Sequence, residues 1–167
     1  MKQVKNKSTK GFTLIELLVV IAIIALLSTV VMSGLNSARS KGRDAKRLTD
    51  IKQLQAALEL YFDTCKGYPG YATGSAVVVG TLTAQYGGCA TAVLTDYMNP
   101  LPVNPRPVSP VANGADYKYC PTALAAPITC AGVASGNAAS YMITFALEGS
   151  SGSLTAGMHS ATPSGIQ

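Results

Sequence analysis

An almost unbroken apolar run near the start of the chain constrains this protein more than any other feature of its sequence. From Phe12 to Met32 the only charged residue is Glu16. At a rise of ~1.5 Å per residue, a helix over this run is long enough to cross the ~30 Å hydrocarbon core of a bilayer. The run is also longer than the apolar core of a secretory signal, which has about 7–15 residues. The sequence therefore predicts a membrane-spanning helix that is retained.

The charge balance gives little support to a nucleic-acid partner. The chain has 13 basic and 8 acidic residues, and its formal net charge is +5. Four of the basic residues are lysines that precede Gly11. Without them the basic residues outnumber the acidic ones by only one, so the remainder of the chain is nearly neutral.

The helix is expected to continue well beyond the apolar run. No proline precedes Pro69, and apolar residues recur at steps of three and four, which is typical of an amphipathic helix. These residues are Leu48, Ile51, Leu54, Leu58, Tyr61 and Phe62. We predict one helix from Phe12 to about Asp63, weakest at Ser33 and Gly34, where helix propensity is low.

The rest of the chain indicates loops and strands. "CKGYPG" ends the helix, and the proline-rich "NPLPVNPRPVSP" fits neither a helix nor a central strand. "AVVVGTLT", "DYKYC" and "SYMITFALE" are predicted strands, and "GSLTAGMH" closes a hairpin after the turn "GSSG". "SYMITFALE" places Tyr141, Ile143, Phe145 and Leu147 on one face. A small antiparallel sheet covering the helix stripe gives an α+β fold.

The four cysteines, Cys65, Cys89, Cys120 and Cys130, all follow the apolar run. None forms a CxxC pair, and the single histidine, His159, is distant in sequence, so no zinc site is predicted. An even number of cysteines on one side of a membrane segment indicates two disulfides in an oxidising compartment. Three connectivities are open. The short loop between Cys120 and Cys130 favours that pair, which leaves Cys65–Cys89.

The stretch "KGFTLIELLVVIAIIALL" resembles the processing and assembly motif of type IV pilins and of the pseudopilins of type II secretion systems. The matching elements are a short basic leader, a glycine followed by a phenylalanine, a threonine–leucine step and a glutamate fifth from the phenylalanine. The resemblance implies a pilin fold with five segments. These are a leader (1–11), the membrane half of the helix (12–33), its amphipathic half (34–63), a connecting loop region (64–113) and a C-terminal antiparallel β-sheet region (114–167).

Three residues acquire roles through this resemblance. Gly11 is the last leader residue, after which a prepilin peptidase cuts. Phe12 becomes the N-terminus and is N-methylated, and Glu16 neutralises the terminal amine of a neighbouring subunit. The physical chemistry agrees, because a new α-amino group has a pKa near ~7.7–8.0 and is largely cationic. Opposite charges about 4 Å apart gain roughly 4 kcal/mol at an effective dielectric constant near 20, comparable with the cost of burying a carboxylate.

The resemblance also implies partners and a location. The chain is expected to span the inner membrane once, with a cytoplasmic N-terminus, although basic residues flank both ends of the span. Its expected partners are copies of itself, the prepilin peptidase and N-methyltransferase, a platform protein, an assembly ATPase and, before assembly, membrane lipid. The filament is expected to be an extracellular pilus for adhesion, motility or DNA uptake. The alternatives are a short secretion pseudopilus and a non-polymerising membrane receptor.

A basic cluster follows the apolar run and comprises Arg39, Lys41, Arg43, Lys46 and Arg47. We expect it to pair with acidic residues of a neighbouring subunit. Contact with anionic lipid headgroups is the second interpretation, and DNA binding is the third.

No enzymatic activity, metal or cofactor is predicted. His159, Ser160 and Asp116 lack the local sequence of a nucleophile site, and no glycine-rich phosphate loop is present. Some major pseudopilins bind calcium in a C-terminal loop. No acidic residue follows Glu148 here, so the oxygen ligands of such a site are absent from the sequence.

Overall fold

The computed structural model describes residues 11–70, 76–82, 89, 92–106, 116–122 and 138–167. The chain divides into two compact units, Met1–Arg39 and Ser40–Gln167, which are described separately. The first unit contains the N-terminal part of helix α1 (Leu14–Cys65), and the second contains the remainder of that helix and a five-stranded sheet.

Helix α1 has identifiable signals at both ends. Its first residue follows Thr13, whose hydroxyl oxygen accepts a hydrogen bond from the Glu16 backbone N–H. At the other end, Lys66 donates its backbone N–H to Phe62 O at 2.7 Å and adopts a left-handed conformation with φ 56°. The predicted helix was therefore correct to within two residues at each end. The left-handed position, however, belongs to Lys66 rather than to the adjacent Gly67.

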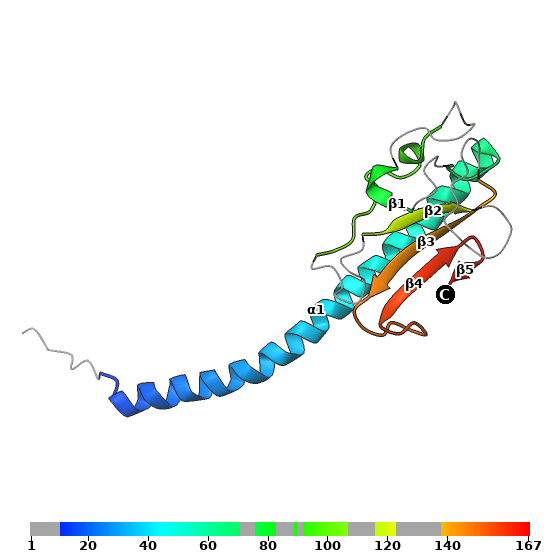
Figure 1. Ribbon diagram of the computed structural model, residues 1–167. Coiled ribbons are helices and arrows are strands. Elements are labelled where there is room, and N and C mark those ends of the chain that lie inside the picture. The colour runs from blue at the N-terminus through cyan, green and yellow to red at the C-terminus, as the bar shows by residue number, and fades with distance from the viewer. Residues whose placement is uncertain (1–10, 71–75, 83–88, 90–91, 107–115, 123–137) are drawn as a thin grey trace, which may run out of the picture. The chain divides into compact units, whose positions relative to one another are not determined.

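The sheet is antiparallel and has the strand order β1-β2-β3-β4-β5 (Figure 1). The strands are β1 (Val77–Val78), β2 (Lys118–Thr122), β3 (Ser140–Leu147), β4 (Gly157–Thr162) and β5 (Gly165–Ile166). A short 3-10 helix, η1 (Val79–Thr81), follows β1, and a second, η2 (Leu94–Asp96), lies between η1 and β2 in the sequence. The α+β prediction is confirmed.

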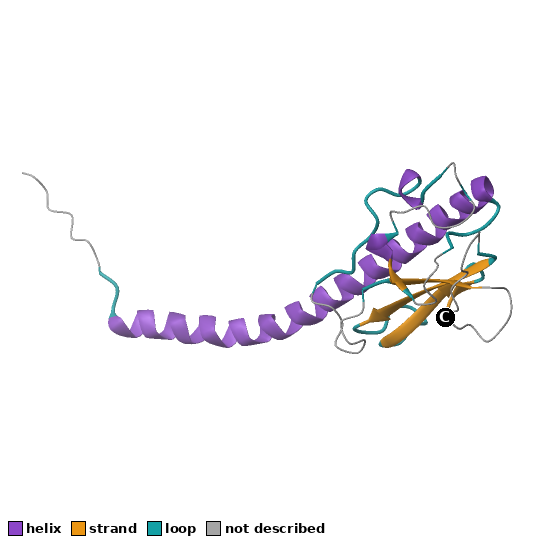
Figure 2. Ribbon diagram, turned by 45° about the horizontal axis from the view of Figure 1, so that its top comes forward, coloured by secondary structure: helices purple, strands orange, loops and turns teal. Residues whose placement is uncertain are grey.

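The core of the second unit lies between α1 and one face of the sheet, as Figure 2 shows. Ile51, Leu54 and Leu58 on the helix are fully buried, as are Ile143 and Phe145 on β3. Each such side chain contributes roughly 1.5–3 kcal/mol when it leaves water. The predicted inner face of β3 and the predicted helix stripe are thus the two surfaces that meet, except that Phe62 at the end of the stripe is exposed.

Three strands differ from the prediction. In the predicted strand "AVVVGTLT", only Val77 and Val78 pair with β2, and the chain then turns into the 3-10 helix η1. The "GSLTAGMH" strand begins only at Gly157, because Ser151 and Leu154 close a tight local bridge first. Strand β2 contains Pro121, which lacks a backbone donor. The strand tolerates it because β1 pairs only with Lys118 and Tyr119, so Pro121 has no β1 residue opposite it.

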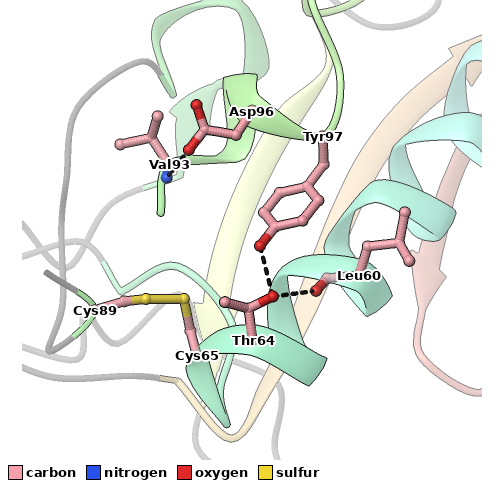
Figure 3. The surroundings of a disulfide bond; sticks show 7 residues. All are labelled: Leu60, Thr64, Cys65, Cys89, Val93, Asp96 and Tyr97. Atoms are coloured by element: carbon pink, nitrogen blue, oxygen red, sulfur yellow. Dashed lines mark hydrogen bonds between the residues drawn. A yellow bond between two sulfur atoms is a disulfide. The ribbon is translucent and has the colours of Figure 1, made fainter. Parts of the chain in front are cut away.

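A disulfide joins Cys65, the last residue of α1, to Cys89 (Figure 3). Beside it, Tyr97 donates its hydroxyl proton to the Thr64 hydroxyl at 2.6 Å, and Thr64 donates to Leu60 O. These contacts fasten the segment around η2 to the end of the helix. Cys120 is also disulfide-bonded, whereas Cys130 lies outside the described residues.

Candidate assembly site at the start of the apolar helix

The Gly11–Phe12 peptide precedes the helix and is open to solvent. Residues 11–13 are not helical, and the Phe12 side chain is 89% exposed. No heavy atom outside its chain neighbours lies within 4 Å of the position that a Cβ on Gly11 would take. A protease therefore has access to this bond in an irregular segment.

Thr13 and Glu16 form a capping box at the first turn of α1. The Glu16 carboxylate accepts the Thr13 backbone N–H at 2.8 Å and the Thr13 hydroxyl at 2.6 Å, both through Oε2. In return, Glu16 donates its backbone N–H to Thr13 Oγ1 at 3.3 Å. Oε1 has no hydrogen bond among the described residues, so half of the carboxylate is left for another donor.

Sequence reasoning missed the role of Thr13, although the signal was present. The letters "TLIE" carry threonine at the cap and glutamate three residues later, which is the sequence signature of a capping box.

The helix that follows presents apolar side chains on every side. From Phe12 to Met32 all large apolar side chains are exposed, and the least exposed, Val19, is still 49% accessible. The Ser28 and Thr29 hydroxyls donate to backbone carbonyls within the helix, at 2.7 Å each, so they too are satisfied without water. α1 is the one helix among the described residues that is long and apolar enough to cross a membrane. Such a surface requires a lipid or protein environment.

Known proteins share sequence features with this chain. Residues 6–32 match the model of the prokaryotic N-terminal methylation motif. A type II secretion system core protein G from Pectobacterium carotovorum subsp. carotovorum is 34% identical over 76 residues, which is 46% of this chain and 49% of the relative. The type IV major fimbrial protein FimA of Dichelobacter nodosus is 39% identical over 80 residues, or 47% of this chain and 49% of the relative. The chain therefore carries an N-terminal methylation motif and is similar in part to a type IV fimbrial protein and to core proteins of type II secretion systems.

Each of these similarities covers only part of the two molecules compared. A core protein G from Klebsiella michiganensis is 35% identical over 65 residues, or 39% of this chain and 46% of that protein. The chain thus spans about half the length of the curated relatives it matches. No solved structure matches it.

In the second unit, most residues of the basic cluster form ion pairs within their own chain. Arg47 is fully buried, and its Nη1 lies 2.7 Å from both Asp44 and Glu148. Arg43 donates to the Glu148 carboxylate from Nε at 2.8 Å and from Nη2. Asp44 in turn accepts the backbone N–H groups of Glu148 and Gly149. We call Arg43, Asp44, Arg47 and Glu148 the ion cluster; it fastens α1 to the end of β3.

The ion cluster shifts the pKa values of Glu148 and Arg43. The hydrogen bond from Arg43, together with Arg47, lowers the pKa of Glu148 to about 2. The same hydrogen bond raises the pKa of Arg43. Nearby, Lys46 pairs with Asp50 at 3.0 Å, and Tyr117 donates its hydroxyl proton to Asp50. Three of the five residues of the basic cluster therefore have partners in their own chain.

The remaining sequence candidates do not assemble into a reactive site. The ring nitrogens of His159 face the carbonyl oxygens of Thr155 and Gln167, while Asp116 lies 3.6 Å from Arg106. Among the described residues, no group of three or more His, Cys, Asp or Glu side chains is placed to hold a metal ion. Gly11, Phe12 and Glu16 lie together in the first unit, and the described cysteines belong to the second.

Proposed function

We propose that this chain is a prepilin, a structural subunit that is cut between Gly11 and Phe12, methylated on the new N-terminus and polymerised into a type IV pilus-like filament. The observation that carries the proposal is the half-satisfied Glu16 carboxylate at the head of an exposed apolar helix. Thr13 holds one carboxylate oxygen, and the other is directed to the terminal amine of a neighbouring subunit after cleavage.

The energetics make assembly conditional on cleavage. Before it, Phe12 is joined to Gly11 by a neutral amide, and Glu16 has no cation to meet. After it, the amine and the carboxylate gain roughly 4 kcal/mol at about 4 Å, and each is costly to bury alone. The apolar surface of 12–32 then exchanges lipid for neighbouring helices, and the small residues Ala22, Ala25 and Ser28 permit close approach.

The proposal assigns partners and a route. The prepilin spans the inner membrane once with a cytoplasmic leader, and its C-terminal part lies outside, where disulfides form. A prepilin peptidase and N-methyltransferase, a platform protein and an assembly ATPase process and extract it, and the finished filament is extracellular. The protein acts structurally, not as an enzyme.

A secretion pseudopilus is the second candidate, because several relatives are core proteins of type II secretion systems. The two candidates share the assembly site and differ in filament length and location. Electron microscopy of surface-sheared material separates them, since long sheared filaments indicate a pilus and their absence from assembling cells indicates a pseudopilus.

Glu16→Ala tests polymerisation itself. In cells that process the chain, we expect the variant to remain membrane-inserted while filaments fall by at least about tenfold, the effect of losing more than ~1.4 kcal/mol per subunit contact. Immunoblots of membranes and sheared fractions measure both. A filament yield equal to that of the wild type would contradict the proposal. It would also be contradicted if the intact mass of the mature protein showed that residues 1–11 are still present.

A further inference from the structure

The pairing of charges separates the basic residues beyond the leader into two groups. All nine lie among the described residues, and five of them form ion pairs within the chain: Arg43, Lys46, Arg47, Lys66 and Arg106. In the part of the chain that the structure describes, the other four form none: Arg39, Lys41, Lys52 and Lys118. Arg39 and Lys41 therefore stand apart from the rest of the basic cluster.

Arg39 and Lys41 are the first charges on α1 after Glu16. No residue from Leu17 to Ala38 is charged. At ~1.5 Å per residue this uncharged stretch is about 33 Å long, close to the ~30 Å hydrocarbon thickness of a bilayer. When Glu16 lies at one boundary of the hydrocarbon, Arg39 and Lys41 lie just beyond the other.

Helix geometry directs both side chains toward that boundary. Side chains on a helix lean toward its N-terminus, which here is the direction of the apolar run. Long basic side chains use this lean to place their charge at the headgroup layer. Arg39 and Lys41 are two residues apart, which corresponds to a rotation of about 200° around the helix axis, so their side chains project on opposite sides. Both are exposed.

We propose that Arg39 and Lys41 bind the phosphate groups of anionic phospholipids while the subunit is still in the membrane. This inference rests on the membrane-inserted prepilin of the proposed function. Guanidinium and ammonium groups are suitable donors for a lipid phosphate. The contact holds the subunit at a fixed depth, and it must break when the subunit is extracted into a filament.

The alternative partner for these cations, a carboxylate of a neighbouring subunit, is disfavoured by the same pairing. All eight acidic residues lie among the described residues, and each already accepts a hydrogen bond or forms an ion pair within its own chain. A leaflet of anionic lipid presents phosphate groups at the depth of Arg39 and Lys41. A carboxylate of a neighbouring subunit would first have to break its existing hydrogen bond or ion pair.

The full uncleaved chain in phosphatidylcholine nanodiscs with a minor share of phosphatidylglycerol provides the test. Native mass spectrometry of the released protein measures how strongly phosphatidylglycerol is retained.

The test variant is Arg39→Gln with Lys41→Gln. The matched control is Lys52→Gln with Lys118→Gln, which removes the same charge from two other exposed, unpaired positions. A basic residue near an anionic surface contributes about a fivefold gain in affinity, so we expect retention to weaken about thirtyfold in the test variant and little in the control.

Equal retention by the test variant and the wild type would overturn the inference, and so would equal losses in the test and control variants. Inorganic phosphate that displaces the lipid, where chloride at the same ionic strength does not, would instead assign a site for the free ion. A DNA duplex bound through these two residues, with lipid retention unchanged in the variant, would assign a nucleic-acid surface. A chain that never enters the disc would count against the proposed function as well, whereas insertion without lipid retention counts against this inference alone.

Discussion

At the scale of single residues, Glu16 has one partner present from synthesis and a second that forms on processing. Thr13 satisfies one carboxylate oxygen in the uncut chain at 2.6 and 2.8 Å. This arrangement fixes the side chain in the first turn, where the helix macrodipole favours an anion by ~0.3–1 kcal/mol. The charge is therefore oriented before its counter-ion exists.

Thr13→Val tests this orientation. Valine keeps the shape of threonine and removes the hydroxyl, so the Glu16 N–H loses its acceptor and the carboxylate loses a donor. We expect a loss of about 1 kcal/mol in capping and roughly fivefold fewer filaments in sheared fractions. Thr13→Ser keeps the hydroxyl and serves as the control. Equal filament yields from the valine and serine variants would contradict a role for the hydroxyl.

At the scale of elements, the backbone conformation at the C-terminal end of α1 is less stable than the capped conformation at its N-terminal end. Lys66 adopts φ 56°, a conformation that costs a residue with a Cβ about 1 kcal/mol and costs glycine little. Its exposed pair with Asp63 contributes little in return, because solvent screens both charges.

Lys66→Gly is consequently expected to stabilise the protein by about 0.5–1 kcal/mol, through relief at the left-handed position. Lys66→Ala removes the same ion pair without relieving the backbone, and we expect it to be nearly neutral. Thermal melts of the full chain in detergent, followed by circular dichroism, compare the two. A glycine variant no more stable than the alanine variant would contradict the argument.

At the scale of the whole molecule, the ion cluster makes the free energy of unfolding depend on pH in the acidic range. The folded-state pKa of Glu148 is about 2, below the value of ~4.3 for an unfolded glutamate. The stabilisation is therefore complete above about pH 4.5 and is lost as the pH falls toward 2.

Glu148→Gln should lower the free energy of unfolding at pH 7 by about 2 kcal/mol, since a charged acceptor is lost while Arg47 stays buried. The variant should also lose much less stability than the wild type between pH 4.5 and 2.5. Denaturant titrations at several pH values measure both effects. Parallel pH profiles for the two proteins would show that other groups govern the acid response.

The Cys65–Cys89 disulfide acts at the same scale, because it closes a loop across a sequence separation of 24 residues. Such a loop restricts the unfolded chain by about 3 kcal/mol in the chain-entropy model. Replacing Cys65 and Cys89 by alanine should lower stability by about that amount, measured by denaturant titration under oxidising conditions. Reduction also breaks the disulfide of Cys120 in both proteins, so under reducing conditions the wild type and the variant should have equal stability. A difference between them that persists after reduction would contradict this role.

Much of this fold was predictable because its signals are local. The apolar run is continuous, and the helix stripe and the alternation in β3 each repeat at the period of one element. The long helix and the inner face of β3 were predicted correctly, and so was the helix stripe except for Phe62, which is exposed. The predicted start of β4 was wrong because a bridge between Ser151 and Leu154 takes the place of the first hairpin pairs. Such a bridge cannot be recognised from amino-acid composition.

The sequence by itself determined the long helix, its exposed apolar half and the motif at residues 6–32, because these depend on neighbouring residues and on helix periodicity. Only the tertiary structure decided what the basic cluster does. Arg43 and Arg47 meet Glu148 across about a hundred residues, and this pairing depends on where β3 ends against the helix. A list of charges gives their number but not their partners, since ion pairing depends on distance and burial in the folded chain.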